Sequence, residues 1–172
     1  TDYSRVSSIL NLATTNFMRL RAKGCAISDI QALTYDTPQN AGCAFFSKDG
    51  GDFPFLDDSH YQYMWTAPYL DHIGTDKPEA AFIIVMTDTG GAEPDWDSSA
   101  EAICNYYNTK SGITYTLDKS ETVLGSTSLS INTSNPAGAA STLPSAFQGH
   151  ATGCMYDQSF GGFVFYMVAE ER

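Results

Sequence analysis

The apolar residues at the start of the chain recur every three or four positions, which is the period of an amphipathic helix. They form one stripe, made of Val6, Ile9, Leu10, Ala13, Phe17 and Leu20. Gly24 ends the pattern, so we predict a helix over residues 3–23. Because Leu12 and Met18 widen the apolar side, we expect this helix to lie against a sheet, since a coiled coil would show a narrower seam.

Two apolar runs further along the chain predict strands. Residues 80–86 are apolar throughout and lie between Pro78 and Gly90, which is typical of a strand in the interior of a sheet. Residues 163–168 form a second very apolar run near the end of the chain. Weaker strand candidates occupy residues 44–46, 61–65 and 113–117.

A second, shorter helix is predicted over residues 98–111. Ser98 and Glu101 have the spacing of a capping box, in which side chains satisfy the free N–H groups at the start of a helix. Gly112 is a suitable stop. Residues 125–150, by contrast, are rich in small and polar residues and contain two prolines, which is typical of an exposed loop region.

The order of these elements predicts one domain, residues 1–172, with an α+β fold. No Pro/Ser-rich linker separates two balanced halves, and the length suits a single core. We divide the domain into a first helix, a loop and sheet region, a second helix and a C-terminal sheet region. These parts occupy residues 3–23, 24–97, 98–111 and 112–172.

The composition adds a strong negative charge, a formal net charge of −11. This charge makes nucleic acid a poor partner, because phosphate binding needs clustered Lys and Arg. Four of the nine basic residues fall in the first helix, and these are Arg5, Arg19, Arg21 and Lys23. No apolar run reaches the length of about 18 residues that spans a bilayer. Membrane attachment would therefore need a segment that precedes Thr1.

The cysteines of the chain are Cys25, Cys43, Cys104 and Cys154. They form no C-x-x-C pair and have no histidine at metal-ligand spacing, which disfavours zinc. The even count and scattered spacing favour an oxidising compartment with two disulfides over four free buried thiols in the cytosol. Four cysteines allow three pairings. We favour the sequential one, 25–43 and 104–154, although the residues alone do not decide among the three.

Two acidic loops are candidates for calcium, which takes six to eight oxygen ligands. The first contains Asp49, Asp52, Asp57 and Asp58, and the second contains Asp88, Glu93, Asp95 and Asp97. Neither loop follows the EF-hand pattern, so solvated turns are the preferred interpretation and calcium is the less favoured one. No other cofactor is predicted.

Other chemistry-bearing residues form no recognisable catalytic motif. His60, His72 and His150 have no Ser or Cys partner in a catalytic setting, and no G-x-S-x-G, H-E-x-x-H or Walker-type loop is present. Aromatic residues could form a platform for a sugar or a partner, although such residues are more often core. These residues are Tyr61, Tyr63, Trp65, Tyr69 and Trp96. We therefore expect a protein that is not an enzyme.

The chain resembles the soluble part of a type IV pilin or pseudopilin, of the minor-pilin kind. The resemblance rests on the first helix, on residues 101–108 (EAICNYYN) and on the ending from Gly153 to Tyr166. It implies that the helix is the second half of a longer one, whose hydrophobic first half anchors the subunit in the inner membrane and later packs in the filament core. It also implies an antiparallel sheet under the helix and a Cys104–Cys154 bridge that bounds the C-terminal region.

The function that this resemblance predicts is that of a structural subunit of a bacterial type IV pilus or type II secretion pseudopilus, at the cell surface or in the periplasm. The apolar stripe of residues 6–20 is then the expected assembly face. Other pilin or pseudopilin subunits are the expected partners, with a surface or a secreted protein as a possible further ligand. Two alternatives stay open. One is a secreted adhesin or carbohydrate-binding module, and the other is a small extracellular hydrolase that uses carboxylates such as Asp95 and Asp97.

Overall fold

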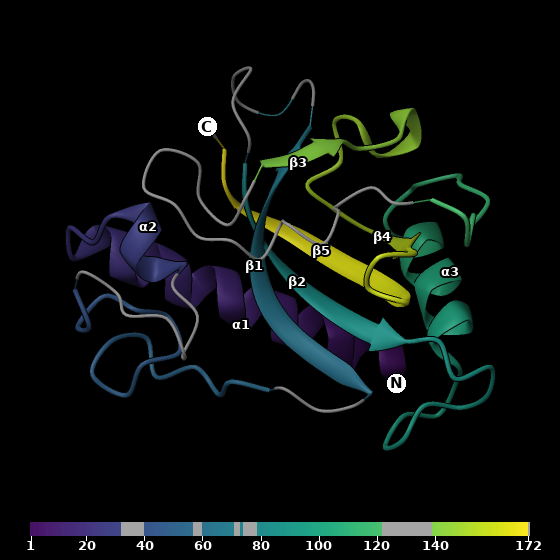
Figure 1. Cartoon of the computed structure of the whole chain (residues 1–172), viewed down its shortest axis with the longest axis horizontal. Coiled ribbons are helices and arrows are strands. Elements are labelled where there is room, and N and C mark those ends of the chain that lie inside the picture. The colour runs from purple at the N-terminus through teal and green to yellow at the C-terminus, as the bar shows by residue number, and fades with distance from the viewer. Residues whose placement is uncertain (32–39, 57–59, 71–72, 74–78, 122–138, 172) are drawn as a thin grey trace.

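The computed structural model describes residues 1–31, 40–56, 60–70, 73, 79–121 and 139–171. Its centre is a five-stranded sheet with the order β3-β1-β2-β5-β4 (Figure 1). The strands are β1 (Tyr61–Tyr69), β2 (Ala80–Thr87), β3 (Ala139–Thr142), β4 (Thr152–Asp157) and β5 (Gly162–Glu170). The helices are α1 (Asp2–Ala22), α2 (Ile27–Ile30), α3 (Ala100–Lys110) and the 3-10 turn η2 (Ser145–Phe147).

Four of the five strands form an antiparallel sheet. β1 pairs with β2, β2 with β5, and β5 with β4, all antiparallel, whereas β3 pairs with β1 in parallel. The strand predicted at residues 80–86 is β2, whose apolar run lies between two neighbours and is buried on both faces. The predicted α+β fold, with a helix on an antiparallel sheet, is therefore confirmed.

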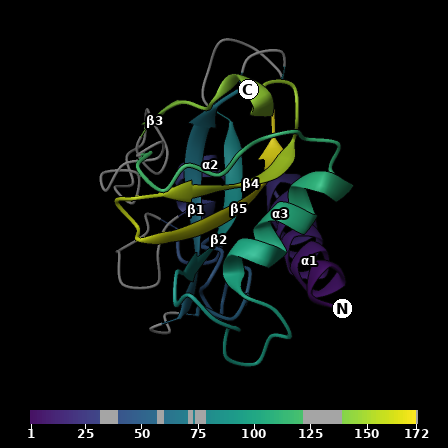
Figure 2. The same ribbon diagram turned by 90° about the vertical axis from the view of Figure 1, so that its right-hand side faces the viewer.

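The two longer helices cover the same face of the sheet, as Figure 2 shows. The Phe17 ring of α1 packs against Trp65 of β1 with 4.8 Å between ring centroids. Cys104 of α3 is bonded to Cys154 of β4. The ends of both helices follow the expected glycine signals, because Gly24 and Gly112 have φ angles of 91° and 74°, which an L side chain rarely adopts.

Both predicted disulfides are present, in the sequential pairing. Cys25–Cys43 ties the end of α1 to the following loop, and Cys104–Cys154 ties α3 to β4, with Cα–Cα distances of 5.5 and 5.4 Å. Such bridges are typical of proteins that fold in an oxidising compartment. Within the described residues, no helix is both long enough and apolar enough to cross a bilayer.

Several local predictions need correction. Residues 44–46 form turns and no strand, and residues 113–117 have no regular structure. Residues 44–46 belong to an aromatic loop. Phe45 is buried because its ring packs on Phe82, with the centroids 5.5 Å apart, so its apolar character does not require a strand. The cap of α3 is Ser99, whose hydroxyl accepts from the N–H of Ala102, so the capping box expected at Ser98 is wrong by one residue.

The expected assembly face also needs correction. Five members of the apolar stripe have no exposed surface, because they form the contact between α1 and the sheet of the same domain. These are Val6, Leu10, Ala13, Phe17 and Leu20, while Ile9 is partly buried. A surface that contacts another subunit through α1 must therefore lie on the opposite side of the helix.

Candidate functional site

The outer side of α1 carries no charge over residues 6–18, the stretch between Arg5 and Arg19. The chain as a whole, by contrast, carries a formal net charge of −11. The outward side of a surface helix usually carries charges, so this run is unusual. We call the exposed residues of this side the outer α1 face: Ser8, Asn11, Leu12, Thr15 and Met18.

The outer α1 face carries two large apolar side chains. Leu12 is 64% exposed and Met18 is 54% exposed. In the described part of the chain, only Tyr106 is a comparably exposed large hydrophobic residue. The short side chains of Ser8 and Thr15 lie between Leu12 and Met18 around the helix and allow another helix to approach closely.

A groove lies at the N-terminal end of α1, against the start of α3. Its volume is about 310 Å³. The walls are partly apolar and partly acidic, and they include Asp2, Tyr3, Asp97, Ile103 and Tyr106. The rings of Tyr3 and Tyr106 meet edge to face with 5.8 Å between centroids. The backbone N–H of Asp97 donates to Oδ1 of Asp2 at 3.0 Å, which fixes the two acidic residues beside each other.

One cation lies close to this end of α1 and is engaged within the domain. The guanidinium of Arg5 lies over the ring of Trp96, 4.2 Å from its centroid, and donates to the backbone oxygen of Asp95. Within the described residues, Asp2, Asp95 and Asp97 form no salt bridge with a Lys, Arg or His side chain. The N-terminal end of α1 therefore holds the carboxylates of Asp2, Asp95 and Asp97 beside the guanidinium of Arg5.

The other end of α1 is basic. Arg21 pairs with Glu170 of β5 at 2.8 Å and also donates to the backbone oxygen of Cys25. The guanidinium of Arg19 donates to the side chain of Asn16, which is neutral. Lys23 is exposed and has no ion-pair partner among the residues that the structure describes. Two cations at this end are thus not neutralised by a carboxylate.

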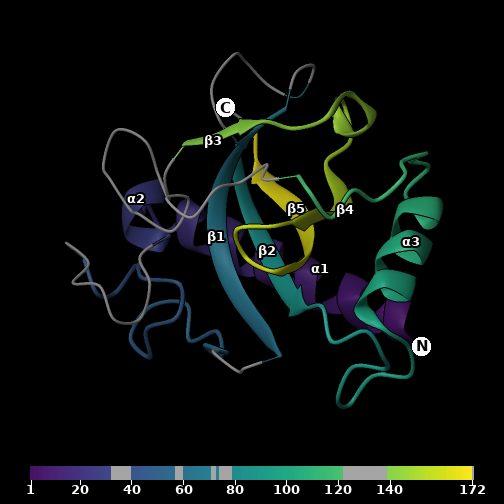
Figure 3. The same cartoon turned by 45° about the vertical axis from the view of Figure 1, so that its right-hand side comes forward.

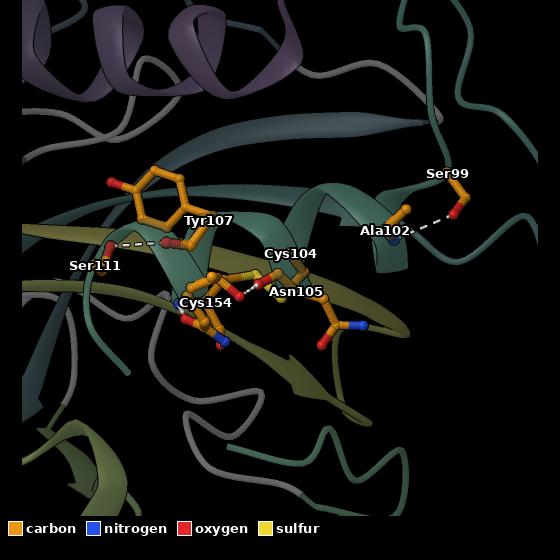
Figure 4. Close-up of a disulfide and its surroundings, with 9 residues drawn as sticks. Ser99, Ala102, Cys104, Asn105, Tyr107, Ser111 and Cys154 are labelled. Carbon is orange, nitrogen blue, oxygen red and sulfur yellow. Dashed lines mark hydrogen bonds between the residues drawn. A yellow bond between two sulfur atoms is a disulfide. The ribbon is translucent and has the colours of Figure 1, made fainter. Parts of the chain in front are cut away.

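The disulfide between α3 and β4 belongs to a buried polar seam (Figure 4). Beside it, the side-chain amide of Asn108 donates to the backbone oxygen of Cys154 and accepts from its N–H, both at 2.7 Å. β4 is an edge strand, and α3 stands beside that edge of the sheet in Figure 3. Asn108 therefore pairs with backbone groups that a further strand would otherwise bind. Sequence reasoning missed this residue, although Asn108 stands four positions after Cys104 on the buried side of α3, whereas Asn105 is exposed.

The acidic loops proposed for calcium receive no support. In the described residues, no three His, Cys, Asp or Glu side chains come together as a metal site. Asp88 pairs with Lys119 at 2.7 Å, and Oε1 of the buried Glu93 accepts from the hydroxyl of Thr89. Asp95 is exposed.

The other candidate loop is described only in part. Asp49 and Asp52 are exposed, and Asp57 and Asp58 lie outside the described residues. Calcium therefore stays an untested prediction.

Of the aromatic residues considered as a platform, the four whose side chains are described, Tyr61 among them, are buried or half-buried. Trp65 and Trp96 are buried, at 1% and 7% exposure, and Tyr63 is half-buried. The side chain of Tyr69 is not described. Two of the five rings therefore belong to the core, where they are not accessible to a sugar.

The histidines are spread over the fold. His60 and His150 are half-buried, and His72 lies outside the described residues. The backbone oxygen of His150 accepts from the hydroxyl of Tyr166 at 2.8 Å. Burial raises the pKa of Tyr166 well above its usual value, with a smaller contribution from neighbouring Tyr107. The two described histidines lie in different parts of the fold, His60 just before β1 and His150 just before β4.

Comparison of the chain with protein-family models, with curated proteins and with solved structures returned no match.

Proposed function

We propose that the protein is a structural subunit of a bacterial type IV pilus or type II secretion pseudopilus, and that it assembles through the outer α1 face. The observation that carries this proposal is the outer side of α1, which has no charge over residues 6–18 and exposes Leu12 and Met18. A helix that stays in water gains nothing from such a surface. A helix that packs against copies of itself in a filament buries it.

The energy of this contact is substantial for its size. Burial of one Leu or Met side chain stabilises an interface by about 1.5–3 kcal/mol before the entropy cost of association. Because Leu12 is 64% and Met18 54% exposed, burial of what remains exposed supplies about 2–3.5 kcal/mol for each subunit. Repetition of the same contact along a filament adds these contributions for every copy.

The layout of the domain supports the same proposal. Type IV pilins, by the resemblance stated above, carry an N-terminal helix on an antiparallel sheet and a disulfide that bounds the C-terminal region. Here α1 packs on the sheet, and Cys104–Cys154 closes residues 104–154, a segment that includes β3 and η2 and ends within β4. Disulfides also suit an assembly at the cell surface or in the periplasm, outside the reducing cytosol.

Immunogold electron microscopy on cells that produce the protein tests this proposal. Antibodies against the folded domain should label surface filaments, and the protein should appear in the fraction that mechanical shear releases. If the cells express the secretion genes but no pili, the protein should instead form short periplasmic assemblies. Chemical cross-linking should then give a ladder of oligomers of the protein. Recovery of the protein only as a monomer, with no labelled filament or ladder, would contradict the proposal.

A further inference from the structure

We propose that Met18 is a modification site of the outer α1 face. A hydroperoxide oxidises its thioether to the sulfoxide while the subunit is unassembled, and the oxidised subunit is then excluded from the filament. The exclusion from the filament rests on the proposed function, because it requires subunits that assemble through the outer α1 face. The selective oxidation of Met18 is a property of the folded domain alone.

The exposure of the methionine side chains singles out Met18. All five methionines lie in the part of the chain that the structure describes. Met18 is 54% exposed, whereas three others are at most 5% exposed, and these are Met64, Met86 and Met155. Met167 is half-buried, and its sulfur accepts from the hydroxyl of Thr14 at 3.8 Å. Met18 is therefore the methionine that an oxidant in solution reaches most easily.

No thiol competes with Met18 for the oxidant. All four cysteines are described, and they are paired in the Cys25–Cys43 and Cys104–Cys154 disulfides. Free thiolates are the usual first targets of oxidants in proteins. Because this chain has none and its other thioethers are shielded, Met18 is the most accessible two-electron reductant of the folded domain.

The oxidation step balances between the thioether and the peroxide. A lone pair of the Met18 sulfur attacks one oxygen of hydrogen peroxide, and the O–O bond breaks as the S–O bond forms. The other oxygen leaves as water, so the sulfur loses the two electrons that the peroxide gains. A methionine sulfoxide reductase reverses the change with two thiols, which become a disulfide while the sulfoxide oxygen leaves as water.

The effect of the sulfoxide differs between the free subunit and a packed contact. Oxidation gives a flexible apolar side chain a polar S–O group. In the free subunit this group faces water, because Met18 lies outside the core, so the fold keeps its stability. In a contact between helices the same group loses its hydrogen bonds to water, which weakens the contact by about tenfold or more.

The rest of the outer α1 face does not respond to the oxidant. Leu12, its other large apolar side chain, has no atom that a hydroperoxide oxidises. The modification therefore acts through one residue. Since assembly covers Met18, it acts before assembly, and subunits already in a filament are protected.

Peptide mass spectrometry of the purified protein treated with hydrogen peroxide tests the modification site. We expect sulfoxide to form at Met18 at least about tenfold faster than at Met64, Met86 or Met155 in the folded protein. In urea the rates should converge, because the fold and not the local sequence sets the order. The unfolding midpoint of protein oxidised at Met18 alone should match that of untreated protein. Equal rates at Met18 and Met155 in the folded protein would overturn the inference.

A pulse of hydrogen peroxide on cells that produce the protein tests the effect on assembly. The sulfoxide fraction at Met18 is then measured in shear-released filaments and in the unassembled protein. We expect it to be at least about fivefold higher in the unassembled protein. Met167 on β5 is the internal control, and its sulfoxide fraction should be the same in both samples.

Two variants separate Met18 from a general effect of peroxide. Met18→Gln places a polar amide at the same exposed position, so it should fold like the wild type but be depleted from the filament fraction without any oxidant. Met167→Leu is the matched control, and its amount in filaments should fall after peroxide treatment as the wild type does. Wild-type amounts of Met18→Gln in filaments would contradict the inference.

Failure of this inference is distinct from failure of the proposed function. Labelled filaments whose subunits carry as much Met18 sulfoxide as the unassembled protein would leave the function in place and remove the exclusion of oxidised subunits. Selective oxidation of Met18 in cells that hold no filament or ladder would leave the modification site in place and remove the proposed function.

Discussion

Replacement of Asn108 by alanine should destabilise the domain far more than its position on a surface helix suggests. Asn108 is 3% exposed, and its amide makes two hydrogen bonds of 2.7 Å to the backbone of Cys154. Asn108→Ala leaves a buried N–H and a buried C=O without a partner, at about 1–3 kcal/mol for each group. Alanine returns about 0.5 kcal/mol through its higher helix propensity.

The expected net loss for Asn108→Ala is therefore about 2–5 kcal/mol, against about 5–15 kcal/mol for the stability of a whole domain. Asn108→Asp should cost at least as much near neutral pH. It keeps the acceptor for the Cys154 N–H but turns a carboxylate oxygen toward the Cys154 carbonyl.

Urea unfolding followed by circular dichroism, with both disulfides intact, measures this difference. The slope of free energy against urea should stay unchanged, since the same surface is exposed on unfolding. Asn105→Ala is the matched control, because Asn105 is exposed on the same helix and should change stability by no more than about 0.5 kcal/mol. If Asn108→Ala costs no more than Asn105→Ala, the view that Asn108 substitutes for a neighbouring strand is refuted.

Three further predictions address the rest of the fold. Paired alanine substitutions that remove the Cys104–Cys154 bridge should lower the free energy of unfolding by about 4 kcal/mol, and removal of Cys25–Cys43 should lower it by about 3 kcal/mol. The difference follows because the bridges span 50 and 18 residues. Equal unfolding midpoints in urea for the two variants would contradict this order. Phe17→Ala, at a side chain with no exposed surface, should cost about 3–5 kcal/mol, whereas Leu12→Ala should change stability by no more than about 0.5 kcal/mol, as thermal unfolding would show. Because the pKa of Tyr166 is raised in the folded protein, this tyrosine ionises in the unfolded chain first as the pH increases. Its contribution to stability is intact below about pH 10 and then falls by about 1.4 kcal/mol per pH unit. Tyr166→Phe should therefore flatten the profile of stability against pH above about pH 10, and an unchanged profile would contradict this prediction.

Much of the fold follows from local signals in the sequence. The period of the first helix, the continuous apolar run of β2 and the glycines after α1 and α3 each have one physical interpretation, and the structure has these elements. Ala44, Phe45 and Phe46 were misread as a strand because a short apolar run only indicates burial. Here the burial comes from ring contacts with Phe82, which is far away in sequence, and with Phe53, which lies on the same loop.

The candidate site was less predictable, for a related reason. Periodicity identifies which side of a helix is buried, but it does not say whether the buried side faces its own sheet or another subunit. Val6 and Phe17 face the sheet of their own domain. The surface available to another subunit is therefore the outer α1 face, which does not belong to the apolar stripe. Asp2 and Asp97 lie side by side in the groove between α1 and α3. No local pattern in either segment of the sequence predicts this contact.

The central claim is that the outer α1 face holds subunits together. The most direct test is the amount of the protein in shear-released filaments from cells that carry Leu12→Asp/Met18→Asp, relative to cells that carry Asn105→Asp on α3. Both variants place charge at exposed positions, so both should fold and accumulate like the wild type. We predict that the α1 variant is lost from the filament fraction while Asn105→Asp remains. Wild-type amounts of the Leu12→Asp/Met18→Asp protein in filaments would contradict the claim.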